Sequence, residues 1–360
     1  MRIVDRYILR QVVLTMSFAI LALCAIFIIV DMLESLDEFL DTNASIDVIV
    51  EYYMVYLPEI MKILFPIAML LAILFTIGRM SNTNEITAIK TGGMSLYRMM
   101  IPLLIFATFV SFGQLYFNGW VVPKSNTRKL DIAHQYLRKG QRGKTIYNLY
   151  FRDTPNRNVI MQYYDGARKL GSKVAIEDFA DTEKPRLTAR MEAATIQWDE
   201  EQEMWKLLDI IERNYTGKEV EAITYDSLFI TLNLEHHEIE QLKKSPDEMT
   251  YDELWEYIQL LDQGGKNVRR QLIEYYGNYA FPFANLVVVL FGVPFASIKK
   301  KGGIALQIGA AMVISFMYLV FTKISQTVGY SYDISPELAG WAANIIFLFV
   351  GIVVIIRTRT

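Results

Sequence analysis

The residue types that most often carry chemistry are arranged in this chain in ways that argue against an enzyme. The sequence has no G-x-x-x-x-G-K-[ST] loop to hold phosphates, no H-E-x-x-H motif and no Cys/His spacing suited to zinc. Its one local pair of histidines is His236-His237. Adjacent strand residues point to opposite faces, so an exposed structural role explains this pair better than a metal site. We therefore expect no catalytic residue, no metal ligand and no cofactor bound by this chain.

Two opposite charges inside one apolar run form a first candidate binding group. Glu59 and Lys62 are three residues apart, close enough to pair on one helix face. Ionisable residues within a membrane-spanning run are functional candidates by default, although long side chains near its end can reach water. A local ion pair and a substrate contact explain these two residues equally well. Asp31, near the end of another apolar run, is expected to be hydrated at the interface.

The strongest local pattern is the polar segment 79–95. Ser81 to Asn84 offer side chains that can cap a helix, and Glu85 stands in the first turn, where the helix dipole favours an acid. Gly92-Gly93 would end this helix. The segment predicts a short amphipathic helix at 82–93. The residues expected to contact a partner there are Asn84, Glu85, Ile86, Ile89, Lys90 and Gly93.

Six long apolar runs must position these residues. Most reach the roughly 20 residues that a helix needs to cross about 30 Å of hydrocarbon. Three precede a polar middle segment and three follow it: Leu14–Leu33, Tyr53–Gly78, Met100–Val122, Ala280–Ser297, Ile304–Thr327 and Leu338–Ile356. The sequence therefore predicts a membrane α-helical protein with six transmembrane helices in a 3 + 3 arrangement.

The charges between the runs predict the orientation. Arg or Lys residues precede the first run, lie in 79–98 and 299–301 and close the chain, whereas the loop after the first run carries only acidic charges. Positive charge concentrates on the cytoplasmic side of membrane proteins. Both termini and the 82–93 helix are thus expected in the cytoplasm, with the middle segment across the membrane. A membrane protein of this kind with no nucleotide site of its own suggests a permease that docks a separate ATPase.

The middle segment changes to the two-residue period of half-buried strands. Strands are expected at 144–152, 158–164, 186–198, 204–216 and 227–234, with Trp198 and Trp205 paired across a hairpin. Short strands at this spacing are typical of an all-β sandwich or jelly-roll. Basic and acidic residues nearly balance in this segment, which argues against a nucleic-acid surface.

A helical period returns after Pro246. Leu254, Ile258 and Leu261 form an apolar stripe in a short helix that ends at Gly264-Gly265. The predicted domains are helices one to three in 1–123, a periplasmic jelly-roll-like β domain in 124–245, connecting helices in 246–272 and helices four to six in 273–360.

Several stretches together resemble a known family. Residues 84–95, N-E-I-T-A-I-K-T-G-G-M-S, resemble the coupling helix of the lipopolysaccharide-export permeases LptF and LptG, the YjgP/YjgQ family. Further similar stretches are Asp5–Ile8, Val121–Asn126, Met249–Leu261, Tyr279–Phe283 and Gly292–Ala296. With the 3 + β domain + 3 layout, the resemblance covers essentially the whole chain. It does not distinguish the F from the G subunit, nor a homodimer from a heterodimer of permeases.

The resemblance implies an ABC transporter permease of the bacterial inner membrane that exports lipopolysaccharide. The implied partners are a second LptF/LptG-like permease, a cytoplasmic LptB-like ATPase dimer that uses ATP, a single-span LptC-like protein and a periplasmic LptA-like β protein. Span one of each permease would meet span five of the other at a lateral gate, and the β domains would pass the lipid onward.

Candidate substrate contacts fall into two chemical groups. Lys and Arg hold phosphates well, and large apolar side chains suit acyl chains. The candidates are Lys62, Lys124, Arg128 and Lys129 for the acidic head group, and Phe27, Phe316 and Phe321 for the acyl chains. Some members of the family place basic residues at the outer end of span one, whereas this chain is acidic there.

Three other kinds of protein are alternatives to this permease. A secondary transporter would use broken helices near mid-membrane, for which Pro66 and Pro294 are candidates, yet few charges lie at that depth. Another ABC exporter for lipids or lipoproteins would share the layout. A membrane-anchored scaffold would explain the β domain but not six spans.

Overall fold

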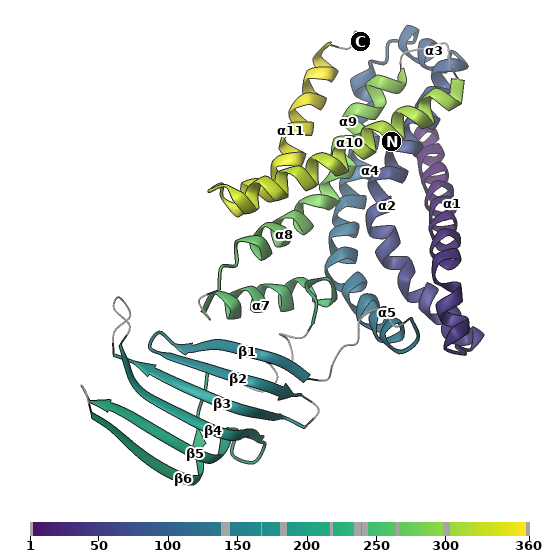
Figure 1. Ribbon diagram of the computed structural model, residues 1–360. Helices are drawn as coiled ribbons and strands as arrows, with labels where there is room; N and C mark the ends of the chain where they lie inside the picture. The colour runs from purple at the N-terminus through teal and green to yellow at the C-terminus, as the bar shows by residue number, and fades with distance from the viewer. Residues whose placement is uncertain are drawn as a thin grey trace. The chain divides into compact units, whose positions relative to one another are not determined.

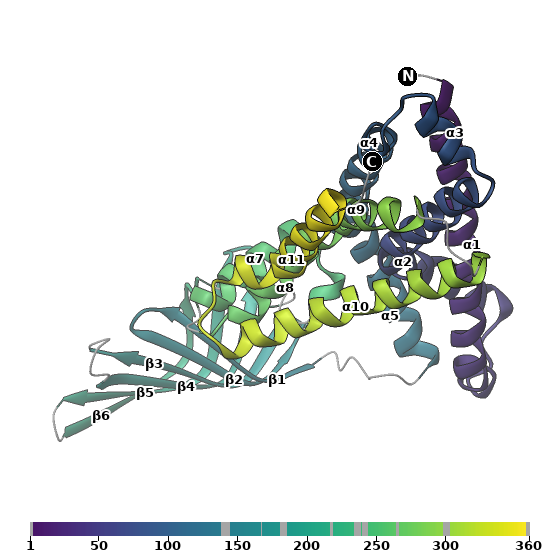
Figure 2. The ribbon, with the colours of Figure 1, turned by 90° about the horizontal axis from the view of Figure 1, so that it is seen from above.

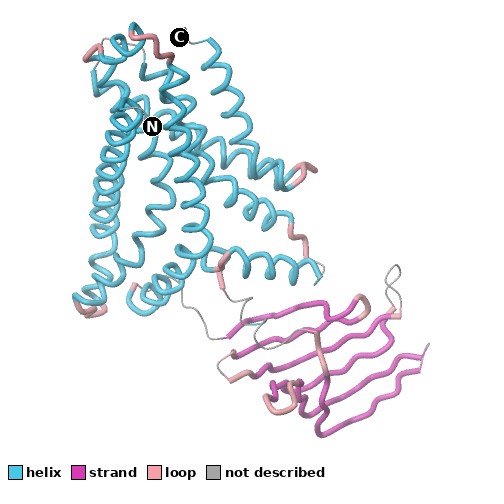
Figure 3. The backbone as a smooth tube through the Cα atoms, turned by 180° about the vertical axis from the view of Figure 1, so that it is seen from behind, coloured by secondary structure: helices cyan, strands magenta, loops and turns pink. Residues whose placement is uncertain are grey.

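The computed structural model of the chain divides into two compact units. It describes residues 3–137, 145–166, 168–180, 186–216, 219–233, 239, 244–263, 266–297 and 303–357. One unit combines Met1–Arg138 with Arg269–Thr360, and the other is Lys139–Val268. His236-His237, the 299–301 basic cluster and Gly264-Gly265 lie outside the described residues. All strands belong to one continuous stretch of the chain (magenta in Figure 3).

The first unit is helical. Six helical runs in the described residues are long and apolar enough to cross a membrane, which confirms the predicted six-span class. Its helices are α1 (Ile3–Asp41), α2 (Ile46–Asn82), α3 (Glu85–Thr91), α4 (Leu96–Tyr116), α5 (Val122–Tyr136), α8 (Arg269–Ala280), α9 (Ala284–Ser297), α10 (Gly303–Ser331) and α11 (Pro336–Arg357) (Figure 1). Two short irregular segments interrupt them: the π-helix η1 (Phe117–Val121) joins α4 to α5, and the 3-10 helix η3 (Phe281–Phe283) joins α8 to α9.

The third span is longer than its apolar run. The predicted β domain began at residue 124, but the chain continues as a helix through η1 and α5 to Tyr136. Pro123 occupies the first turn of α5, where its missing N–H costs nothing, so it does not end the helix. Ile132 and Ala133 then pack α5 against Phe39 and Tyr52. A polar but amphipathic sequence therefore stays helical where the loss of hydropathy suggested a domain boundary.

Helix α2 is at the centre of this unit. It packs against α1, α5, α9 and α10, and most of its apolar window is buried. Helices α8, α10 and α11 pack together beside it (Figure 2). We call the end at which α2 leads through α3 into α4 the α3 end, and the end at which α1 leads into α2 the α5 end.

The second unit contains the inserted all-β domain. Its strands are β1 (Thr145–Thr154), β2 (Arg157–Asp165), β3 (Leu170–Phe179), β4 (Leu187–Asp199), β5 (Met204–Thr216) and β6 (Glu219–Ile230), antiparallel and in sequence order in one sheet (Figure 1). The described strands thus form a meander, not the two stacked sheets of a sandwich. One face is buried against Leu232, Ile239 and Leu260, so residues outside the strands supply the second layer.

Most strand predictions are confirmed, but two differ. Trp198 and Trp205 pair across the β4–β5 hairpin with ring centroids 5.1 Å apart. Strand β3 was not predicted, and β6 runs over Glu219–Ile230 where 227–234 was expected.

A crease runs across all the described strands of the sheet and crosses β3 at Lys173. Each two neighbouring described strands lack one residue-to-residue pairing in the middle of their ladder. The residues that lack it form one row across the sheet: Asn148, Gln162, Lys173, Ala194, Asp209 and Asp226. Lys173 and Asp209 both have a left-handed backbone with φ of 53°. The buried face shifts by one residue there: Ile196 is buried on one side of Ala194 and Ala193 on the other. The strict alternation by which a sequence reveals a strand is therefore broken in mid-strand.

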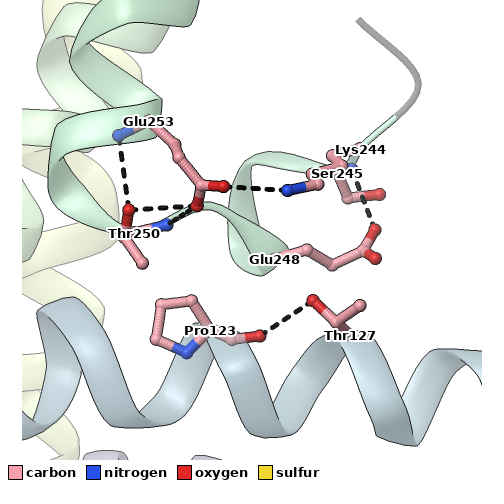
Figure 4. A network of polar contacts seen from close by, with 7 residues as sticks. All are labelled: Pro123, Thr127, Lys244, Ser245, Glu248, Thr250 and Glu253. Atoms are coloured by element: carbon pink, nitrogen blue, oxygen red, sulfur yellow. Dashed lines mark hydrogen bonds and ion pairs between the residues drawn. The ribbon is translucent and has the colours of Figure 1, made fainter. Parts of the chain in front are cut away.

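Helix α7 (Tyr251–Gln263) also belongs to the second unit, and its apolar stripe is confirmed. Leu254, Ile258 and Leu261 are buried. Thr250 and Glu253 form a capping box, in which the Glu253 carboxylate accepts from the Thr250 N–H at 2.8 Å and Thr250 Oγ1 accepts from the Glu253 N–H at 3.3 Å (Figure 4). Burial acts to raise the pKa of Glu253, but hydrogen bonds from Lys244 and Thr250 outweigh it and lower the pKa.

Candidate functional site

The short helix α3 joins two spans. It covers Glu85–Thr91, not 82–93, because α2 itself continues to Asn82. Asn84 takes the N-cap position in a left-handed conformation with φ of 61° and makes no side-chain cap bond, so the predicted capping by its side chain is wrong. Instead the Thr83 hydroxyl donates to Glu85 Oε1 at 2.8 Å. Asn tolerates the left-handed conformation, which lets the chain turn sharply between α2 and α3.

Glu85 is bonded at both carboxylate oxygens. Besides Thr83, the Tyr7 hydroxyl of α1 donates to Glu85 Oε2 at 3.0 Å. The acidic residue of α3 is therefore held toward α1, while its side chain stays only half-buried.

One face of α3 is anchored in the membrane unit. Ile86 is 3% exposed, and Ile89 and Met94 pack against the same core. Lys90 is half-buried, whereas Thr87 and Ala88 are exposed. Ile86 is buried in the chain's own core and is not accessible to a partner. A partner at α3 would therefore meet the exposed Thr87 and Ala88 and the half-buried Glu85 and Lys90.

Glycine ends α3 as predicted. Gly92 N–H bonds to Ala88 O at 3.0 Å, and Gly93 has a left-handed φ of 85° that an L-residue with a side chain rarely adopts. Gly93 thus sets the direction in which the chain enters α4. Ser95 then caps α4 by accepting from the Arg98 N–H at 3.3 Å.

Two polar contacts around α3 were missed by the sequence analysis. Arg98 forms an ion pair of 2.9 Å with Asp5, whose side chain is 4% exposed. The Ser81 hydroxyl donates to Ser297 O at 3.0 Å and ties the end of α2 to the end of α9. An acid at position 5 among basic residues was the available signal for the first contact.

The four basic candidates lie in the helical unit, all at the α5 end or in α2. Lys124, Arg128 and Lys129 are on α5, not in the β domain. Arg128 pairs with Glu51 at 2.7 Å in an exposed position. Lys129 is mostly buried, pairs with Glu59 and lies 4.8 Å from the centre of the Tyr56 ring. Glu59 therefore has a basic partner on another helix. A local ion pair with Lys62 was one of the two explanations that the sequence left open. Lys124 is exposed.

The aromatic candidates are not brought together. Phe27 on α1 is 49% exposed and Phe316 on α10 is 68% exposed. Phe321 is half-buried against Phe347, with ring centroids 5.9 Å apart. A shallow groove of about 440 Å³ follows α10 alone, and its lining includes Lys323 and Val328.

Helices α1 and α10 are the least covered spans. Within their apolar windows, 17% of α1 and 22% of α10 is buried, against 61% of α2. Two long apolar faces are therefore available to lipid or to another membrane protein.

The fold and these contacts define a class of protein before any comparison. The described residues contain no cluster of metal-ligating side chains. In the chain, three spans precede and three follow an inserted β domain, and a short anchored helix lies between the second and third spans. This is the layout of a multi-span membrane protein with an inserted β domain.

The comparisons identify the family. The model of the family "Lipopolysaccharide export system permease LptF/LptG" matches residues 6–357, so the chain belongs to that family. It is similar to the lipopolysaccharide export system permease protein LptG of Escherichia coli strain K12 and to that of strain O6:H1. Each is 22% identical over 364 residues that cover 99% of this chain and 98% of the relative. The predicted family is confirmed, and the secondary-transporter alternative is not favoured.

Proposed function

We propose that this chain is a subunit of an ABC transporter that extracts lipopolysaccharide from the bacterial inner membrane and passes it toward the outer membrane. The observation that carries the proposal is the family match over residues 6–357 in a chain with the complete 3 + β domain + 3 layout. The named relatives are lipopolysaccharide export permease proteins, and the similarity covers 98% of each of them.

The proposed orientation follows from charge. The basic residues in and beside α3 are Arg79, Lys90 and Arg98. The connection between α1 and α2 instead carries acidic residues such as Asp41 and Asp47. By the positive-inside rule α3 and both termini are cytoplasmic, and the β domain is periplasmic.

The energy source is a separate ATPase that docks at α3. The sequence has no phosphate-binding loop of the G-x-x-x-x-G-K-[ST] type, and α3 is well suited to transmit force because Ile86 anchors it in the core while Thr87 and Ala88 face outward. Asn84, Glu85, Ile89, Lys90 and Gly93 complete the proposed coupling site, as residues that position α3 or form its rim.

The second permease meets the exposed faces of α1 and α10. Their low burial supports an interface between two such subunits, with lipopolysaccharide entering between them. Phe27 and Phe316 face outward on these helices and are the proposed acyl-chain contacts. Phe321 is a weaker candidate because Phe347 covers one side of it.

Arg128 and Lys124 are the proposed head-group contacts. An exposed ion pair such as Arg128–Glu51 contributes little because water screens it, so a phosphate can replace the carboxylate at small cost. Lys129 and Lys62 have structural partners in the helical unit and are weaker candidates.

The β domain continues the path through partner β domains. Strand β6 is at the edge of the described sheet, and its residues 220–227 are exposed. An edge strand accepts another strand through its unpaired backbone groups, which is the proposed mode of contact with an LptC-like or LptA-like protein.

Reconstitution tests this function directly. The chain is purified from its own membranes, co-purifying proteins are identified, and the complex is placed in proteoliposomes containing lipopolysaccharide. We expect an ATPase to co-purify and lipopolysaccharide to reach a β-domain acceptor only with ATP, not with a non-hydrolysable analogue. Transport driven by an ion gradient without ATP would instead identify a secondary transporter.

A further inference from the structure

Three neighbouring spans depart from regular α-helical geometry. Helix α2 contains Pro66, the third span contains the π-helix η1, and the fourth contains the 3-10 helix η3 with Pro282. Each departure frees backbone groups from the helical ladder, and within a membrane these groups must be satisfied by neighbouring helices.

One side chain links the freed groups of two of these spans. Pro66 has no N–H, so the carbonyl of Lys62, four residues earlier, has no helical donor. Gln114 Nε2 of α4 donates to that carbonyl at 2.9 Å. Gln114 Oε1 accepts from Asn285 Nδ2 of α9 at 2.7 Å. Gln114 therefore holds α2 and α9 at once.

The break in the fourth span is tied into the same group. Asn285 Nδ2 also donates to Pro282 O at 2.8 Å, and the Ser111 hydroxyl donates to the same carbonyl at 2.9 Å. Ser111, Gln114 and Asn285 are all buried, with at most 2% of each exposed. We call these three side chains, with the carbonyls of Lys62 and Pro282, the Gln114 junction.

The hydrophobic packing of the helical unit changes at this junction. Toward the α3 end, one core includes Ala68–Met80 of α2, Ile86 of α3, Leu96–Ala107 of α4 and Val288–Ala296 of α9. Toward the α5 end, separate clusters contain Ile60 and Leu64 with Cys24, and Tyr52 and Tyr53 with Ile132. On α2, the last buried residue of the α5-end clusters is Leu64 and the first buried residue of the α3-end core is Ala68, so Pro66 lies between the two. The buried residues on the two sides of the three helix breaks thus belong to different clusters, which meet through partly buried residues such as Ile20 of α1.

The junction also has unused hydrogen-bond capacity. Asn118 lies in η1, one turn beyond Gln114, and is 2% exposed. Neither its Oδ1 nor its Nδ2 has a partner in the part of the chain that the structure describes, and Asn285 Oδ1 has none there either. Buried amides are normally satisfied, so unpaired ones beside a π-helix point to a second arrangement in which they find partners.

We propose that the Gln114 junction is the pivot of a two-state switch in the membrane unit. The core at the α3 end tilts about it against the α5 end, and Asn118 takes up hydrogen bonds in the second state. Because Ile86 is part of the core that tilts, a force on α3 is transmitted to the pivot without a flexible connection. The inference rests on the proposed function only in assigning that force to an ATPase.

Spin labels on the two sides of η1 test the pivot. Ile105 is 65% exposed and Gln135 is also exposed, so both accept labels at cysteines in a Cys24→Ser background. In the purified complex without nucleotide, Gln114→Met should broaden the Ile105–Gln135 distance distribution. With ATP and vanadate, the wild type should shift its mean distance and Gln114→Met should lose that shift.

Two further variants make the test specific. Ser325→Ala removes a hydroxyl bond of 2.9 Å to Ala339 O between α10 and α11, away from the three breaks, and should change neither the distribution nor the shift. Pro66→Ala restores a donor for the Lys62 carbonyl. Combined with Gln114→Met, it should narrow the nucleotide-free distribution again but not recover the shift.

The outcomes separate this inference from the proposed function. A Gln114→Met complex with the wild-type distribution and shift overturns the pivot. So does a wild-type complex that contains its ATPase and shows no shift with nucleotide. If no ATPase co-purifies, the proposed function fails, while the nucleotide-free comparison of the two variants still decides whether the junction holds the two ends.

Discussion

Tyr7 and Glu85 are joined by a hydrogen bond of 3.0 Å between the phenol and the carboxylate, although 78 positions separate them in the chain. The bond links α1 directly to α3. Both oxygens of Glu85 are thereby engaged within the chain, since Thr83 holds the other. Glu85 is thus better placed to fix the position of α3 than to act solely as a free anion for a partner.

Substitutions at this pair should uncouple the transporter in different degrees. Tyr7→Phe removes one hydrogen bond, worth about 0.5–1.5 kcal/mol, and should lower lipopolysaccharide-stimulated ATP hydrolysis modestly. Glu85→Lys reverses the charge in the first turn of α3 and removes both acceptor oxygens, so it should abolish stimulated hydrolysis while membrane insertion persists. Hydrolysis by reconstituted complexes, with and without lipopolysaccharide, measures both. A Glu85→Lys complex that assembles fully and keeps stimulated hydrolysis would show that Glu85 has no part in coupling.

The end of α3 offers a comparison between adjacent glycines. Gly93 has a φ of 85°, whereas Gly92 has an ordinary φ of −74° and room for a Cβ at 3.4 Å from its nearest neighbours. Gly93→Ala should cost about 1–2 kcal/mol because a side chain disfavours the left-handed conformation, and Gly92→Ala much less. Thermal unfolding of the purified chain gives the comparison. Equal losses of stability at the two positions would contradict the backbone argument.

The sequence predicts the spans well and the contacts between them poorly. Runs such as Tyr53–Gly78 are apolar for longer than any soluble helix requires, so hydropathy alone identifies them. Helix α5 escaped because its burial depends on a partner helix, and β3 because its burial does not alternate: Val174, Ala175 and Ile176 are buried in succession. The Gln114 bond to Lys62 was unpredictable for a third reason. Nothing local to Gln114 indicates that Pro66 has freed a carbonyl beside it.

The Asp5–Arg98 pair should make a larger contribution to stability than exposed pairs. Arg98→Gln leaves the buried Asp5 carboxylate without its charge partner, which should cost about 1–3 kcal/mol. Asp5→Asn combined with Arg98→Gln should recover part of the loss, since no charge then remains buried. The melting temperatures of the single and double variants form the required cycle. Additive losses would mean that the two residues do not interact.

The β domain should lose stability in acid through Glu192. A hydrogen bond from Arg213 Nη1 at 2.5 Å, aided by Arg190, lowers the pKa of Glu192 below its usual 4.5. A carboxyl with a lowered folded-state pKa stabilises the fold above its unfolded value. That contribution disappears as the pH falls from about 4.5 through the lowered pKa.

Hydrogen exchange of β4 and β5 peptides, corrected for intrinsic rates, measures this effect in the whole protein. Protection should fall more steeply below pH 4.5 in the wild type than in Glu192→Gln, which has no carboxyl to titrate. Glu221→Gln on β6 is the matched control and should follow the wild type. Identical acid profiles for the wild type and Glu192→Gln would rule out this ion pair as the cause.

The same substitution at Arg128 and at Lys129 should change stability to very different degrees, because one ion pair is exposed and the other is largely buried. Lys129→Gln leaves Glu59 partly buried without its cation and removes the contact with the Tyr56 ring, so the melting temperature should fall clearly. Arg128→Gln should leave the melting temperature nearly unchanged, since water screens an exposed ion pair. If Arg128 holds a lipid phosphate, lipopolysaccharide captured by a photocrosslinker at Lys124 should nevertheless decrease in Arg128→Gln. Undiminished capture in that variant would restrict Arg128 to its ion pair with Glu51 and remove it from the substrate path.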